Sequence, residues 1–175
     1  MEFTISGMIY ASLGLLIVSF PYLFYILKSK RIAKDNSLSF QEFTLSQNLN
    51  LDKIQSWRNH YMLGLDSSKN TLVYGRQGQF PAQTLVRLDE IDHVRLESFY
   101  REVKERNERR QKLEHLYLVL HFKDSAKLPK SIPIYDADEV QSLADEIAIA
   151  HKWLNYLKDQ LSIKQAPSEL LQKAS

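Results

Sequence analysis

The chain of 175 residues contains no cysteine, and it has only five glycines and five prolines. The absence of cysteine excludes disulfides, thiolate nucleophiles and thiolate metal sites, and it agrees with a reducing compartment. The scarcity of glycine and proline argues against low-complexity linkers. Apart from its first residues, the chain therefore reads as one small globular domain.

Motifs of common enzymes are also missing. The sequence contains no H-E-x-x-H, G-x-S-x-G or G-x-G-x-x-G, and Gly75-x-x-Gly78 lacks the Lys-Ser/Thr of a phosphate-binding loop. The formal net charge of +2 is too balanced for the basic face of a nucleic-acid-binding protein. We therefore expect no catalytic activity, no cofactor and no nucleic-acid partner.

Two groups of side chains remain as candidates for chemistry. Asp89, Glu90 and Asp92 form an acidic cluster that could hold a cation or act as an acid–base pair, and an acidic turn explains the cluster equally well. His115 and His121 would share one face of a strand. At about 3.3 Å per residue they would lie roughly 20 Å apart, too far to bind one metal ion together.

The longest uncharged run, residues 5–27, contains 23 residues. As a helix it would be about 34 Å long, enough to cross a hydrocarbon core of about 30 Å. A cleaved signal peptide would carry basic residues before the apolar core, and residues 1–4 contain none. A small soluble domain could not surround so long an apolar helix. The run therefore predicts a retained transmembrane helix over residues 5–27.

Basic residues follow this run directly, and they are Lys28, Lys30, Arg31 and Lys34. Positive charge next to a span stays in the cytoplasm and contacts anionic headgroups, so these four residues form the expected membrane interface. The amino terminus should then lie outside the membrane. The carboxy-terminal domain should be cytoplasmic, as in a single-pass membrane protein.

Three small residues share one face of the expected span. Gly7, Ala11 and Gly14 are spaced at i, i+4 and i+7, which permits two helices to approach closely and form a homodimer. Small residues are also common in membrane helices that make no such contact. The oligomeric state therefore stays open.

A juxtamembrane linker with a short helix is expected over residues 28–56. Ser39-Phe40-Gln41-Glu42 has the form of a capping box, which predicts that the short helix begins there. Phe40 and Phe43 would share one face of that helix and pack on the core of the domain.

Alternating apolar residues then predict a series of strands. The first two form a hairpin around a polar turn at residues 66–70, and a proline places the last strand at a sheet edge or bulge. The expected strands are residues 61–65, 71–74, 84–88, 91–96, 115–123 and 131–135.

Residues 97–114 form a charged insert with six basic and five acidic residues. Three glutamates precede a basic residue by four positions, which suits a solvated helix, and a long protruding hairpin fits equally well. A solvated excursion is the simplest interpretation. Contact with a partner or with lipid headgroups would use the basic side chains. The candidate interaction residues are Arg101, Lys104, Arg106, Arg109 and Arg110.

The last predicted element is a helix over residues 138–161. Acidic residues at 136–139 favour a helix start, and apolar residues at helical spacing form one stripe, on which His151 would be a partnered core residue. Trp153 would lie beside that stripe. Pro167 is expected to end any helix, which makes residues 162–175 a flexible tail.

The order of these elements resembles a known group. The hairpin YMLGLDSSKNTLVYG, the strands VRLDEIDHVRLE and a closing helix with Trp153 resemble the pleckstrin-homology-like (PH-like) domains of bacterial membrane proteins over about residues 57–161. The resemblance implies an α+β fold in which a PH-like antiparallel β-barrel or sheet, capped by a C-terminal helix, follows the transmembrane helix. Six strands are predicted against the usual seven of the family, and residues 99–103 could supply the seventh.

Two functions follow from the anchor and the resemblance. The first is a membrane-tethered cytoplasmic adaptor that has no catalytic activity and binds an unidentified protein partner. The alternative is a lipid-surface-sensing or lipid-handling PH-like domain, although the lipid-binding lysines of the family have no residue-by-residue counterpart here. A hydrolase that uses the acidic cluster at residues 89–92 is a third hypothesis, and it requires a cleft around these carboxylates.

Overall fold

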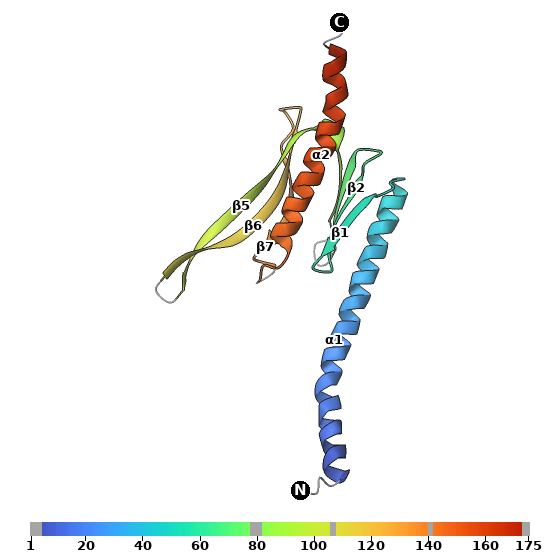
Figure 1. The fold of residues 1–175 in the computed structure, drawn as a ribbon, viewed down its shortest axis with the longest axis vertical. Coiled ribbons are helices and arrows are strands. Elements are labelled where there is room, and N and C mark those ends of the chain that lie inside the picture. Colours follow the sequence, from blue (N-terminus) through green and yellow to red (C-terminus); the bar gives the residue numbers. More distant parts are fainter. Residues whose placement is uncertain (1–4, 78–81, 106–107, 140–141, 173–175) are drawn as a thin grey trace.

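The computed structural model describes the backbone of residues 5–77, 82–105, 108–139 and 142–172, and the side chains of residues 17–77, 82–104, 109–139 and 142–163. Within these ranges a long helix precedes two antiparallel sheets, and a second helix follows them (Figure 1). The fold is α+β as predicted. The sequence predicts either an antiparallel barrel or a sheet. Both described sheets are open, so the prediction of a sheet is confirmed and that of a closed barrel is wrong.

The elements follow one another in a simple order. The first helix is α1 (Ile5–Ser46) and the second is α2 (Glu146–Gln172). The four-stranded sheet consists of β1 (Lys53–Trp57), β2 (Tyr61–Asp66), β3 (Thr71–Arg76) and β4 (Ala82–Arg87). A short 3-10 helix, η1 (Leu88–Glu90), leads into the three-stranded sheet. That sheet consists of β5 (Ile91–Glu105), β6 (Glu108–Phe122) and β7 (Lys130–Asp136).

Helix α1 is one continuous helix, and this differs from the sequence prediction. Pro21 lies inside it, and the predicted capping box at Ser39 is wrong because Ser39 lies far from either helix end. The separate linker predicted for residues 28–56 is wrong as well, since its first part continues α1 and its last part is strand β1. Burial of Phe40 against the first sheet explains why the helix continues to Ser46.

Within the residues whose side chains the structure describes, no helix is both long enough and apolar enough to cross a membrane. The side chains of residues 5–16 lie outside the described set, and with them the first part of the span predicted for residues 5–27. Gly7, Ala11 and Gly14 also belong to that part.

The first sheet is covered on both faces. Met62 and Val73 point to α1 and pack with Phe40, as predicted for this phenylalanine, while the alternate residues Leu63 and Leu72 point into the main core. Glycine permits the close approach of α1: a Cβ added at Gly75 would lie 2.6 Å from Cδ2 of the Phe40 ring. All residues of β2 and all but one of β3 are therefore buried.

Within the described residues, β1 is a strand in addition to the six predicted ones. The suggestion that residues 99–103 supply a further strand is wrong because these residues lie inside β5. β1 pairs with β2 from Lys53↔Leu65 to Trp57↔Tyr61. Trp57 also joins the two sheets, since its Nε1 donates to the carbonyl oxygen of Ile134 at 3.0 Å.

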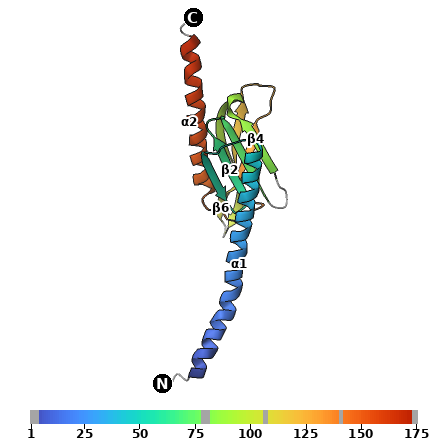
Figure 2. The ribbon, with the colours of Figure 1, turned by 90° about the vertical axis from the view of Figure 1, so that its right-hand side faces the viewer.

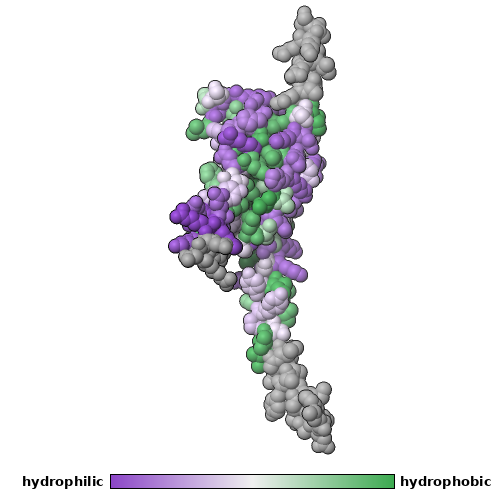
Figure 3. Space-filling model, turned by 60° about the vertical axis from the view of Figure 1, so that its left-hand side comes forward, coloured by the Kyte–Doolittle hydropathy of each residue, from purple (hydrophilic) through white to green (hydrophobic). Residues whose placement is uncertain are grey.

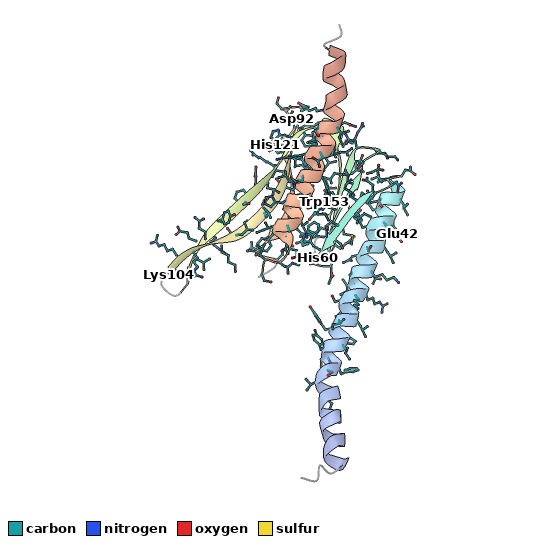
Figure 4. The ribbon with its side chains drawn as sticks, in the orientation of Figure 1. Glu42, His60, Asp92, Lys104, His121 and Trp153 are labelled. Carbon is teal, nitrogen blue, oxygen red and sulfur yellow. The ribbon has the colours of Figure 1, made fainter. Side chains whose placement is uncertain are left out.

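Helix α2 closes the main core, with Trp153 at the centre of its buried face (Figures 1 and 4). The predicted stripe is confirmed only in part. Leu157 and Leu161 are buried as predicted, whereas His151 is exposed and the rest of the buried apolar face consists of Ile149, Ala150 and Trp153. The largest side chain sets the buried face because it fills the space between the two sheets.

The boundaries of α2 also differ from the prediction. The helix begins at Glu146, whose carboxylate accepts a hydrogen bond from the Ala144 backbone N–H at 2.6 Å. The acidic residues at 136–139 form a separate turn, in which Asp136 accepts the backbone N–H of Asp138 at 3.0 Å. At the other end the helix passes Pro167 and reaches Gln172, so Pro167 does not end it.

Strands β5 and β6 extend far beyond β7 as a two-stranded arm (Figure 1). Of the two interpretations of the charged insert 97–114, the protruding hairpin is the one that the structure contains. Pairing continues from Ile91↔Phe122 to Glu105↔Glu108, with a bulge between Phe99 and Tyr100. We use "the arm" below for the described residues 100–104 and 109–113.

Candidate functional site

Helix α1 is fixed to the first sheet at the turn between β1 and β2. Asn59 Nδ2 donates to Ser29 Oγ at 2.7 Å, and Asn36 Nδ2 donates to the Asn59 carbonyl oxygen at 2.6 Å. Arg58 and Asn59 both adopt left-handed backbone conformations, with φ of 52° and 62°. Such conformations are costly for residues other than glycine, so the bonds from α1 and from α2 stabilise an otherwise unfavourable turn.

A cavity of about 370 Å³ lies at this junction, just beyond the end of the uncharged run. One wall is a single face of α1 and the other is the β1–β2 turn. The lining residues are Tyr25, Lys28, Ser29, Ile32, Arg58, Asn59 and His60. The site combines hydrogen-bond donors with positive charge, which is the chemistry that binds anions.

The charges around this cavity are unequal. Arg58 donates to the Glu146 carboxylate and to the Ser142 carbonyl oxygen, so its charge is largely compensated. Although burial opposes the change, the hydrogen bond from Arg58 lowers the pKa of Glu146. Burial lowers the pKa of His60, which keeps this imidazole neutral near pH 7. Lys28 is the exposed cation of the cavity.

The four predicted interface cations are all exposed on α1. Only Lys28 lines the cavity. Lys30, Arg31 and Lys34 lie beyond the uncharged run, between Ser29 and Asn36, the two residues of α1 that bond to the β1–β2 turn. At about 100° per residue, these three cations lie on one side of α1 within roughly one turn, which is compatible with the predicted contact to headgroups.

The arm holds four of the five predicted interaction residues, and the fifth, Arg106, lies outside the described residues. Lys104 pairs across the hairpin with Arg109, and Val103 pairs with Arg110. Neighbouring positions point to opposite faces, so cations occur on both faces of the arm. The helical alternative, on which the predicted i, i+4 pairs depended, is wrong because the described backbone of the insert is extended. Each of those pairs includes a side chain that lies outside the described residues.

The acidic cluster of residues 89–92 does not form a common site. The Asp89 carboxylate accepts a hydrogen bond from the Asn70 amide. Glu90 binds Lys127, with 2.6 Å between Oε2 and Nζ, and Asp92 contacts its neighbour His93. Each carboxylate is thus partly exposed and has its own partner, an arrangement that does not favour an acid–base pair.

The histidines of the second sheet have separate surroundings. His121 stacks on His93 across the sheet, with ring centroids 4.4 Å apart. His115 lies near two carboxylates instead, and ligand atoms of His115, Asp136 and Asp138 fall within 4.8 Å of one another. Imidazole and carboxylate are ligands for divalent cations. Sequence reasoning missed this group because it joins β6 to the end of β7.

The residues that sequence reasoning missed most completely are Arg58, Asn59 and His60. They follow an unrecognised strand and contain none of the Asn-Gly or Asp-Gly signals of a tight hairpin turn. Their place beside Lys28 follows from the packing of α1 on the sheet, which no local pattern reveals.

Comparison with known proteins identifies no relative, since no family model, curated protein or solved structure matches this sequence.

Proposed function

We propose that the protein is a membrane-tethered interaction module without catalytic activity, anchored by the uncharged run at the start of α1. One observation carries the proposal: eight large apolar side chains between residues 17 and 27 are 55% to 78% exposed. These residues are Ile17, Val18, Phe20, Tyr22, Leu23, Phe24, Tyr25 and Leu27. A helix that is apolar all round requires an apolar environment, because exposing this surface to water is unfavourable.

The charge that follows the apolar run supports lipid as that environment. Four exposed cations stand immediately after Leu27, as at the cytoplasmic end of a membrane helix. Tyr22 and Tyr25 precede them, at a level where tyrosine favours the interface. The proposal includes the single-pass orientation, with the amino terminus outside and the sheet domain in the cytoplasm.

The join between anchor and domain supports a tethering role. Phe40 packs into the outer face of the first sheet, and Ser29 and Asn36 bond to the β1–β2 turn. These contacts connect the domain to the helix that carries the anchor, and the domain would present its remaining surface to an unidentified protein partner. Seven strands in sheets of four and three, with a closing helix, also support the proposed PH-like assignment.

The anchor is tested by Ile17→Lys in the full chain, with Leu38→Lys as the matched control. Both side chains are exposed on α1, but Leu38 lies beyond the basic residues. A lysine near the centre of a membrane helix is unfavourable by about 2.5–3.5 kcal/mol. We expect the Ile17→Lys chain to be extracted from membranes by alkaline carbonate and the Leu38→Lys chain to be retained. Extraction of the unmodified chain would contradict the proposal.

The adaptor role is tested separately by affinity purification of the tagged full chain from detergent-solubilised membranes. Recovery of a stoichiometric partner would support it. Recovery of background proteins alone would restrict the proposal to the anchor and the lipid surface.

Sensing of the lipid surface is the second candidate function. It is favoured by the position of the cavity with Lys28, which lies where the uncharged run ends and therefore at the expected level of the headgroups. Flotation of the full chain with neutral and anionic vesicles tests this candidate, and equal recovery from both would count against it.

A further inference from the structure

We propose that the arm between β5 and β6 docks on an anionic lipid surface. This inference rests on the proposed membrane anchor and assigns a ligand to a part of the domain far from α1 in sequence. The ligand class is a surface of negatively charged headgroups, contacted by the cations of the arm.

The position of the arm supports this assignment. Figure 4 shows Lys104 near the tip of the arm and His60 at the end of the first sheet, both at the end of the domain that faces the amino-terminal half of α1. His60 lines the same cavity as Lys28 and Ser29, so this end of the domain is level with the end of the uncharged run. A bilayer that holds the run would therefore place its headgroups near the tip of the arm.

The charge of the arm is complementary to such a surface. Six basic and three acidic residues occur between Arg101 and Lys112, so this part of the chain is positive although the whole insert is nearly balanced. Figure 3 shows the corresponding hydrophilic surface projecting beside the domain. Anionic leaflets attract basic segments within about a Debye length, which is about 8 Å at physiological salt.

Four described cations of the arm, Arg101, Lys104, Arg109 and Lys112, are available for contact. Arg101 and Arg109 have acidic neighbours only at 3.4 Å and 4.0 Å, and both side chains are more than half exposed. Lys104 and Lys112 have no ion-pair partner among the described side chains. These exposed, weakly paired cations can bind headgroups without first breaking a strong ion pair inside the protein.

Exposed aromatic side chains at the base of the arm add to the argument. Phe99 and Tyr100 are 49% and 59% exposed, and they come just before the basic residues. Aromatic rings combined with cations are typical of surfaces that rest at a membrane interface. An acidic protein surface is the competing occupant, but cations on both faces of a thin ribbon present no single shaped face for it.

The absence of cysteine makes a direct test possible, since one introduced cysteine is a unique labelling site. We would place a fluorophore at Gln111→Cys on the arm, and at Ser125→Cys in the loop between β6 and β7 as the control. Figure 1 shows this loop at the opposite end of the domain. The full chain is reconstituted in vesicles of phosphatidylcholine with or without phosphatidylglycerol, and lipids with a quencher on the headgroup are present in both leaflets.

Docking predicts strong quenching at position 111 in anionic vesicles, several-fold weaker quenching in neutral ones, and weak quenching at position 125 in both. High salt should reverse the effect, because screening shortens the reach of the charges. Equal quenching at position 111 in neutral and anionic vesicles would overturn the inference and leave the arm to a protein partner.

A charge variant gives a second readout. Lys104→Gln, Arg109→Gln and Lys112→Gln together should lower the ratio of docked to undocked arm by roughly 100-fold, given the usual attraction per basic residue. The matched control carries Lys123→Gln, Lys130→Gln and Lys158→Gln, which remove the same charge outside the arm, and it should dock normally. An equal loss in both variants would overturn the inference, since the effect would then follow net charge.

Failure of the anchor and failure of docking are distinguishable in the same samples. If the chain does not float with vesicles of either composition, the proposed membrane anchor fails and docking fails with it. If the chain floats with both but the label at position 111 is not quenched, docking alone is wrong.

Discussion

The two sheets of this protein differ in how much of their surface is covered. The four-stranded sheet lies between α1 and the main core, so β2 and β3 are buried on both faces (Figure 2). The three-stranded sheet packs its inner face on the main core, leaves His93 and Arg95 exposed on the outer one, and continues into the arm. The first sheet is therefore fixed by packing on both sides, whereas the second provides surface for contacts outside the chain.

The largest expected effect comes from the side chain that both sheets share. Trp153 is 1% exposed at the centre of the main core. Trp153→Ala should lower the free energy of unfolding by about 3–5 kcal/mol, because it removes a large buried side chain and leaves a cavity. Urea unfolding followed by circular dichroism measures this. Tyr100→Ala on the arm is the aromatic control, expected within about 0.5 kcal/mol, and a similar loss in both would break the comparison.

The second largest effect on stability is expected at the outer face of the first sheet, which α1 covers. Gly75→Ala places a methyl group where the ring of Phe40 lies, so the free energy of unfolding should fall by about 1–3 kcal/mol. A second substitution, Phe40→Leu, should weaken this penalty in the double variant because the smaller side chain leaves room. Urea unfolding of the unmodified chain, the two single variants and the double variant gives a double-mutant cycle. Strictly additive losses of unfolding free energy would mean that Phe40 of α1 does not pack closely on Gly75 in solution.

Local patterns predicted the parts of the fold that depend on local periodicity. Strands β2, β3 and β7 were predicted nearly in full, because alternation of apolar residues is visible within each segment. β1 was missed because its turn uses Arg58 and Asn59 in left-handed conformations rather than glycine. The hydrogen bond from Asn59 to Ser29 that supports this turn involves a residue thirty positions away.

The same division holds for the candidate site. The end of the uncharged run and the cations after it could be predicted, because charge along a sequence is directly visible. The buried face of α2 could be predicted only in part, because two apolar stripes share Leu157 and Leu161, and packing against the sheets selects the one with Trp153. The cavity beside Lys28 and the level of the arm depend on how α1 packs, and only the folded chain contains that information.

His60, in the β1–β2 turn that contacts α1, predicts a dependence of stability on pH. Burial lowers the pKa of His60 below 6.5, Glu139 opposes the shift, and Arg76 and Arg58 reinforce it. The Tyr61 ring packs on the imidazole, and Lys28 lines the same cavity. The unfolded chain then binds a proton more readily than the folded chain. This part of the stability is complete above pH 6.5 and is lost as pH falls through the folded pKa.

His60→Gln should therefore flatten the fall of the unfolding free energy below pH 6.5, an effect that cannot exceed about 1.4 kcal/mol per pH unit. Urea unfolding of both chains at about pH 7.5 and about pH 5 measures the difference in slope. His151→Gln, at an exposed position on α2, is the control and should keep the slope of the unmodified chain. Equal slopes for all three chains would show that His60 is not held neutral at the junction.

The smallest effect is expected on the arm. Arg109 Nη1 and Glu102 Oε2 are 4.0 Å apart, with side chains 82% and 65% exposed. Exposed ion pairs of this kind contribute little, so Arg109→Gln should change the free energy of unfolding by no more than about 0.5 kcal/mol in the same urea assay. A larger loss would mean that the arm stabilises the folded domain as the first sheet does. A negligible loss of stability, together with reduced docking in the charge variant, would show that the two sheets have different roles. The cations of the arm would then bind a surface outside the protein and contribute little to the stability of its fold.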